Sequence, residues 1–116
     1  METVSITLSA QARETAFAIC RNVKYEPNKL LSAASLIKKL REGTTPEQKM
    51  VQPPQGTVGD PIEVTIYKNF PDSVAVELTF EEKEILCTAL KAIPQWHPDE
   101  ADIIVELQTK LQIKLV

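Results

Sequence analysis

Glycine is scarce in this chain of 116 residues, which has only Gly43, Gly56 and Gly59. None of the three lies between a predicted strand and a predicted helix, where the backbone amides of a glycine-rich turn would bind a phosphate. The sequence therefore disfavours nucleotide binding.

Histidine and cysteine are also few, with His97, Cys20 and Cys87 as the complete set. A structural zinc site needs about four such ligands, usually in close pairs, so no metal centre is expected. A cysteine nucleophile needs a base within hydrogen-bond reach. Both cysteines fall inside helical patterns and are expected to be reduced and mostly buried. His97 precedes Pro98 in a turn, where we expect a turn or cap role. We predict a non-enzymatic protein without metal or cofactor.

Long apolar runs are absent, because no stretch approaches the roughly 18 residues that a membrane span needs. The first residues, METVSITLSA, have no basic residue ahead of their apolar positions, so neither export nor membrane insertion is expected. We expect a cytoplasmic protein, or one inside a virion if a phage encodes it.

Positive charge is not in excess, since the net charge is −3. Residues 1–61 hold 8 Lys and Arg against 6 Asp and Glu, whereas residues 62–116 hold 5 against 10. The complementary halves either steer one subunit onto another or carry ordinary solvated surface charge. The three basic residues in IKKLREG at 37–43 are too few to dominate a salt-dependent contact, so nucleic-acid binding is disfavoured.

What the chain does have is a regular pattern near its start. Val4, Ile6 and Leu8 alternate with polar residues, which predicts a half-buried strand, and Ser9 can cap the helix that follows. Apolar residues then recur every three or four positions over 10–24 and again over 29–41. These periods predict two amphipathic helices.

A similar pattern returns 70 residues later. Val74, Val76 and Leu78 alternate as the first strand does, and Thr79 and Glu82 form the motif of a capping box. With one further residue inserted, YEPN at 25–28 aligns with WHPD at 96–99. We read two strand–helix–helix units at about 3–41 and 73–112. Either an internal duplication with approximate two-fold symmetry or the common periodicity of helical hairpins explains the likeness.

The segment between the two units differs in composition. Residues 43–61 contain every glycine and four of the eight prolines, without a helical or strand period, which predicts a long loop or arm. Residues 62–67 alternate as a strand, and NFPD at 69–72 predicts a tight turn into the strand at 74–78. The expected fold is therefore a single α+β domain spanning 1–116. Four helices would cover one face of a small, largely antiparallel sheet of three strands, with the strand at 4–8 at one edge.

Two clusters of carboxylates suggest chemistry at first sight. Both fall in the first turn of a predicted helix, where the helix dipole favours acids, so capping and solvation explain them better than acid–base catalysis. The clusters are Glu81, Glu82 and Glu84, and Asp99, Glu100 and Asp102.

The stretch LTFEEKEILCTALKAIPQWHPDEADIIVELQTKL, about a third of the chain, resembles the short helical hairpins of small bacteriophage and bacterial accessory proteins. The motif is generic and transfers no functional residue. The resemblance implies a phage structural or accessory protein.

We expect protein–protein contact, as a component of a larger assembly or by self-association. The predicted arm at 43–61 holds an apolar cluster beside a diproline, and aromatic residues are favoured interface anchors. The predicted contact residues are Met50, Val51, Pro53, Pro54, Tyr67 and Trp96. The cluster can instead pack on its own domain, and Trp96 can instead cover the core. The alternative function is a small regulator or inhibitor that masks a host protein or a nucleic-acid-binding site with the acidic C-terminal half.

Overall fold

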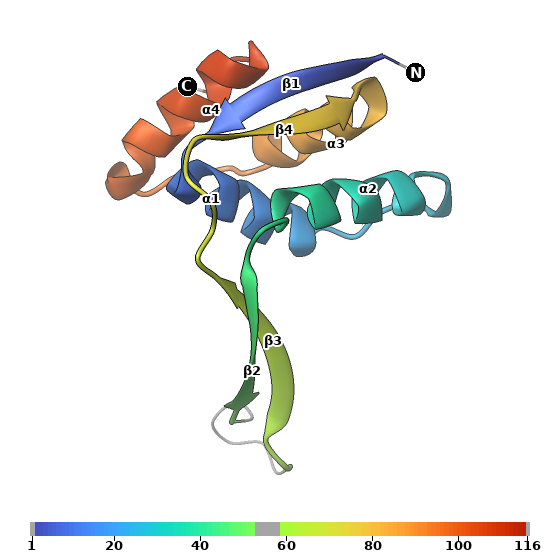
Figure 1. Cartoon of the computed structure of the whole chain (residues 1–116), viewed down its shortest axis with the longest axis vertical. Helices are drawn as coiled ribbons and strands as arrows, with labels where there is room; N and C mark the ends of the chain where they lie inside the picture. The colour runs from blue at the N-terminus through green and yellow to red at the C-terminus, as the bar shows by residue number, and fades with distance from the viewer. Residues whose placement is uncertain (1, 53–58, 116) are drawn as a thin grey trace.

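The structure is a computed structural model that describes residues 2–52 and 59–115 (Figure 1). These residues form four strands, four α-helices and one short 3-10 helix. In order they are β1 (Thr3–Leu8), α1 (Ala10–Arg21), α2 (Pro27–Leu40), β2 (Thr45–Val51), β3 (Ile62–Lys68), β4 (Val74–Thr79), α3 (Phe80–Lys91), η1 (Pro98–Glu100) and α4 (Ala101–Leu111).

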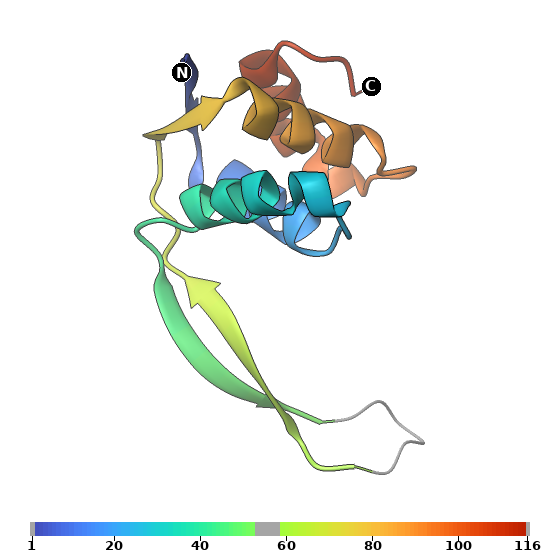
Figure 2. The ribbon, with the colours of Figure 1, turned by 90° about the vertical axis from the view of Figure 1, so that its right-hand side faces the viewer.

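The predicted α+β class is confirmed, but the strands form two separate antiparallel pairs. β1 pairs with β4, and α1 to α4 pack behind this pair to form the helical body. β2 pairs with β3 as a hairpin that projects away from the helical body (Figures 1 and 2).

The core of the helical body lies between the β1–β4 pair and the helices. Ile6 and Leu8 from β1 and Val76 and Leu78 from β4 point inward and are buried. Their polar neighbours along each strand are exposed, as expected for a sheet with one solvated face. Helical residues complete the core, among them Ala16, Cys20, Leu36, Leu40, Leu86, Leu90, Leu107 and Leu111.

The predicted helix starts are confirmed by their caps. The Ser9 hydroxyl accepts a hydrogen bond from the Ala12 amide at 3.2 Å. The Thr79 hydroxyl accepts from the Glu82 amide, while the Glu82 carboxylate accepts from the Thr79 amide, so both halves of the capping box are present. α1 ends at Arg21, three residues earlier than the periodicity predicts.

The sequence predicts a loop without strand structure over 43–61. This prediction is wrong for Thr45–Val51, which form β2. Every residue of β2 is exposed. A strand without a buried face has no reason to alternate apolar and polar residues, so its sequence carries no period of two.

The predicted three-stranded sheet was also wrong. β3 was expected to pair with β4 through the turn at 69–72, but β3 pairs with β2, and β4 pairs with β1 over its whole length. The connection at 69–73 leads back to the helical body instead of forming a hairpin turn. Asn69 and Ser73 adopt left-handed backbone conformations, and the Phe70 ring packs 5.8 Å from that of Phe17.

Candidate partner-binding site

The hairpin has two faces, which follow from its register. Cross-strand partners share a face and the faces alternate along each strand. Val51 and Ile62 lie opposite one another, followed on the same face by Lys49 with Val64 and Glu47 with Ile66. The other face carries Met50 with Glu63, Gln48 with Thr65 and Pro46 with Tyr67.

The far end of the hairpin, which we define as residues 49–51 and 59–64, exposes large apolar side chains. Met50 is 58% exposed, Val51 42% and Ile62 59%. These residues lie on both faces of a two-stranded ribbon with no layer packed behind it. Such a ribbon is marginally stable in water on its own, and clustered exposed apolar residues mark interaction sites.

The base of the hairpin, by contrast, is firmly attached to the helical body. Tyr67 packs edge-to-face on Phe17, with ring centroids 5.4 Å apart. Arg41 from the end of α2 donates a hydrogen bond to the Tyr67 hydroxyl, and its guanidinium lies 4.9 Å from the Tyr67 ring centre. Arg21 of α1 donates to the Thr65 carbonyl at 3.2 Å. Aromatic and cation–π contacts of this kind hold the base of the hairpin in one orientation.

Arg13 joins the two chain segments that connect the hairpin to the helical body. This buried side chain donates to the Val74 carbonyl at 3.0 Å and to the Glu42 carbonyl at 3.3 Å. Burial lowers the pKa of the guanidinium, and the nearby Glu42 carboxylate acts in the opposite direction. Glu42 precedes the hairpin and Val74 follows it. The guanidinium of Arg13 therefore holds the chain segments at both ends of the hairpin.

The predicted contact residues fall into three places. Met50 and Val51 lie at the exposed far end, whereas Tyr67 is half-buried at the base. Trp96 is half-buried against the edge of the core, far from the hairpin in sequence and on the turn before η1. Pro53 and Pro54 lie outside the described residues.

Ile62 and Val64 belong with Met50 and Val51 but were not predicted as contact residues. Their alternation was visible in the sequence and indicated a strand. The pairing with β2 places Ile62 at the exposed far end of the hairpin, whereas Val64 is half-buried.

Among the hollows lined by the described residues, two lie at the helix–helix turns of the helical body. The first, with a volume of about 220 Å³, lies between the α1–α2 turn and α3, and its apolar lining includes Val23, Tyr25, Ile85 and Ala89. Lys24, Lys29 and Glu26 surround it, and we call it the lysine-rimmed hollow. The second lies between the α3–η1 turn and α1, with Ile93 and Trp96 in its lining and Glu14 and Glu100 at its rim; we call it the glutamate-rimmed hollow.

Cys20 is buried in the core of the helical body, and His97 lies in the turn before η1. Burial raises the pKa of the Cys20 thiol to about 12, so its thiolate is not populated near neutral pH. The exposed His97 donates its amide N–H to Glu100 Oε1 at 3.0 Å, within a turn. Among residues 2–52 and 59–115, no group of three or more His, Cys, Asp or Glu is placed to hold a metal ion. Over the same ranges no helix is long and apolar enough to cross a membrane.

In the described part of the chain, the exposed residues of β1 and β4 on the outer face of the pair are mostly polar and include no Lys or Arg. They are Thr3, Ser5, Thr7, Ala75 and Glu77. A nucleic-acid interface gains most of its affinity from Lys and Arg at phosphates.

Comparison of the chain with protein-family models, with curated protein sequences and with solved structures finds no match.

Proposed function

We propose that this protein acts through protein–protein contact, as a component of a larger assembly, and that the far end of the hairpin is its contact surface. The observation that carries the proposal is the contrast along the hairpin. Its base is fixed by Phe17, Arg21 and Arg41, while Met50, Val51 and Ile62 stay exposed at the other end. An element that is held at its base and exposes apolar residues at its far end is suited to bind a partner, because little ordering entropy is lost on binding.

The direct test is the native mass of the complexes recovered from the cells that make this protein, at near-physiological salt. We expect the wild type in a defined complex well above 13.0 kDa. The variant Val51→Ser with Ile62→Ser should elute as the bare chain. Leu31→Ser is the matched control, because Leu31 is an exposed aliphatic residue on α2, 84% exposed. A wild type recovered only as a monomer, or equal loss in the control, contradicts the proposal.

The alternative of a regulator acting through acidic helices has less support. Its carboxylates were Glu81, Glu82, Asp99 and Glu100. Glu82 is buried and bound to Lys39, and Glu100 accepts the His97 amide, so two of the four already have partners inside the protein.

The helical body is also consistent with the proposed duplication. A shift of 70 residues places Val4, Ile6 and Leu8 on Val74, Val76 and Leu78. The register pairs Val4 with Leu78 and Leu8 with Val74, with Ile6 opposite Val76 between them, as a two-fold axis through that central pair requires. The two hollows correspond in the same way, since Val23 and Tyr25 match Ile93 and Trp96.

We therefore propose that two equivalent units, about 3–41 and 73–112, build the helical body, with the hairpin inserted between them. A chain in which residues 44–71 are replaced by a short flexible linker should then keep the helical content of the wild type by circular dichroism. Loss of cooperative unfolding in that chain would contradict the proposed organisation.

A further inference from the structure

We infer that the partner of the hairpin is a second copy of this chain, whose lysine-rimmed hollow receives the apolar far end. This inference rests on the proposed function and adds the identity of the partner and its docking site. The shape of the hollow, the charges at its rim and the position of the hairpin support the inference.

The hollow and the hairpin end match in shape and polarity. Ile85 and Ala89 at the base of the hollow are 5% and 4% exposed, and Val23 at its edge is 36% exposed. The opening is therefore a concave apolar surface with charges only at the rim. The far end of the hairpin is the projecting counterpart, with Val51 and Ile62 exposed together on one face and Met50 exposed on the other. Insertion of Val51 and Ile62 would remove apolar surface from water on both partners.

Charge distinguishes the two hollows at the helix–helix turns from one another. The described part of the hairpin end has two acids, Asp60 and Glu63, against one base, Lys49. The lysine-rimmed hollow offers Lys24 and Lys29 against one acid, so the signs are complementary. The rim acids of the glutamate-rimmed hollow, Glu14 and Glu100, would repel the same hairpin end. Unfavourable charge pairs at the wrong site raise specificity as much as favourable ones at the right site.

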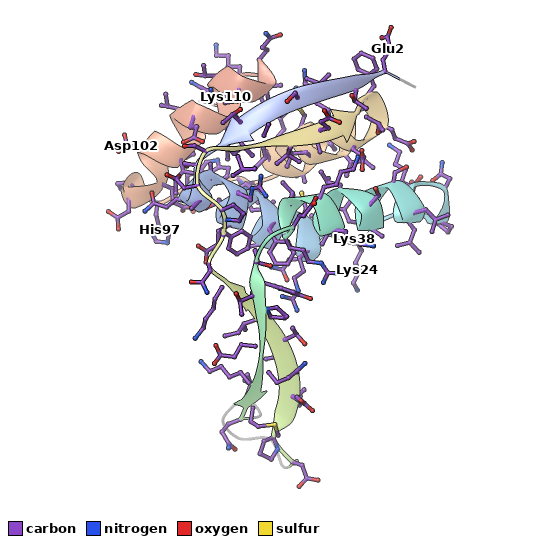
Figure 3. All side chains as sticks on the ribbon, in the orientation of Figure 1. Glu2, Lys24, Lys38, His97, Asp102 and Lys110 are labelled. Carbon is purple, nitrogen blue, oxygen red and sulfur yellow. The ribbon has the colours of Figure 1, made fainter. Side chains whose placement is uncertain are left out.

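The hairpin cannot fill the hollow of its own chain. Both ribbon views show the hairpin pointing away from the helices, with its far end well separated from the α1–α2 turn (Figures 1 and 2). Lys24, which marks that turn, lies on the helical body in Figure 3. The occupant is therefore the hairpin of another copy. Because the described residues of each chain form one hairpin and one lysine-rimmed hollow, the contact is head-to-tail and produces a closed ring or an open chain.

Charge reversal on the two surfaces tests the inference without touching the core. The hairpin variant combines Asp60→Lys with Glu63→Lys, and the hollow variant combines Lys24→Glu with Lys29→Glu; all four residues are exposed. By sedimentation velocity at physiological salt, we expect the wild type to form multiples of the 13.0 kDa chain. Each variant alone should associate at least about tenfold more weakly than the wild type, because it places like charges together.

Association should return in a mixture of the two variants, and in a single chain that carries all four changes, since opposite charges then face one another again. Lys110→Glu on α4 removes a similar exposed charge away from both surfaces and should associate as the wild type does. Circular dichroism of every variant checks that the fold is kept.

A monomeric wild type, or variants that do not restore one another, would overturn the inference. That failure is distinct from failure of the proposed function. If the wild type does not self-associate but Val51→Ser with Ile62→Ser still loses its native complex, the hairpin binds a different protein. If neither hairpin variant changes any complex, the hairpin is not a contact surface, and both conclusions fall.

Discussion

Lys39 Nζ lies 2.6 Å from Glu82 Oε1, so the last turn of α2 is joined to the first turn of α3 by an ion pair. The same Glu82 oxygen accepts the Thr79 amide at 2.8 Å and thereby completes the capping box. Glu82 is 2% exposed, and its second oxygen has no protein partner among the described residues. The Glu82 carboxylate therefore both caps α3 and holds it to α2. Its protonation should weaken both contacts and lower the stability of the fold.

Glu82 should make stability depend on pH. Burial raises its pKa, but the hydrogen bonds from Lys39 and the Thr79 amide outweigh burial, so the folded pKa lies below the usual value. A lowered folded pKa stabilises the fold above the unfolded value of about 4.3, and that contribution is lost as the pH falls through the folded pKa.

We predict that Glu82→Gln reduces the free energy of unfolding at pH 7 by about 1–2 kcal/mol, since Lys39 is partly exposed and screened. The difference from the wild type should vanish in acid, where Glu82 is protonated. Urea titrations from pH 2 to pH 7 measure both quantities. Glu81→Gln, one residue earlier and exposed, is the control. A constant difference at every pH would show that the charge of Glu82 is not the cause.

The two thiols should differ in reactivity. Burial raises the pKa of Cys20 to about 12, and no part of the residue is exposed. Burial also raises the pKa of the half-buried Cys87, with Lys83 and Lys91 acting in the opposite direction. At pH 8 we therefore expect only Cys87 of the folded protein to react with a chromogenic disulfide reagent.

The variant Cys87→Ser should remove nearly all of this reactivity in the folded state, and both thiols of the wild type should react in denaturant. Fast reaction of Cys20 in folded Cys87→Ser would show that the core opens around α1 more readily than its burial indicates.

The contacts at the hairpin base should stabilise β2 and β3 against local opening. Tyr67→Ala removes the contacts with Phe17 and Arg41 at the edge of the core and replaces no fully buried residue. Since an aromatic pair contributes about 0.5–1.5 kcal/mol beyond burial, amide exchange in β2 and β3 should accelerate by up to about tenfold. Exchange in the four helices should not change. Thr65→Ala, which removes one exposed side-chain contact with Gln48, is the matched control. Equal acceleration in both variants would contradict the anchoring role of Tyr67.

The helical body could be predicted from the sequence because its elements each have one buried face. Apolar residues alternate with polar ones in β1 and β4 because one side of their sheet is covered. The start of each following helix is indicated by its N-cap residue, Ser9 or Thr79. The pairing of β1 with β4 joins residues about 70 positions apart, and local periodicity does not determine which strands pair.

The hairpin could be predicted only in part. Met50 and Val51 stood out as apolar residues in a polar segment, but β2 is exposed along its length and left no period in the sequence. The base of the hairpin depends on Arg13, Arg21 and Arg41, which reach it from two helices. Such contacts join distant parts of the chain, so the sequence presents these arginines as ordinary helical surface residues.

Gly43 is the position where the start of the hairpin depends most on a missing side chain. Its φ is +83°, and a Cβ added there would lie 2.9 Å from Pro71 Cγ, on the segment that leads out of the hairpin. Alanine at this site would adopt an unfavourable left-handed backbone and would also push the two ends of the insertion apart. We predict that Gly43→Ala lowers the free energy of unfolding by about 1–3 kcal/mol, measured by urea titration. Gly59→Ala is the matched control, because a Cβ there meets nothing within 4 Å, and it should be neutral or slightly stabilising. If the two variants unfold alike, the close approach of Gly43 and Pro71 does not hold the hairpin to the helical body.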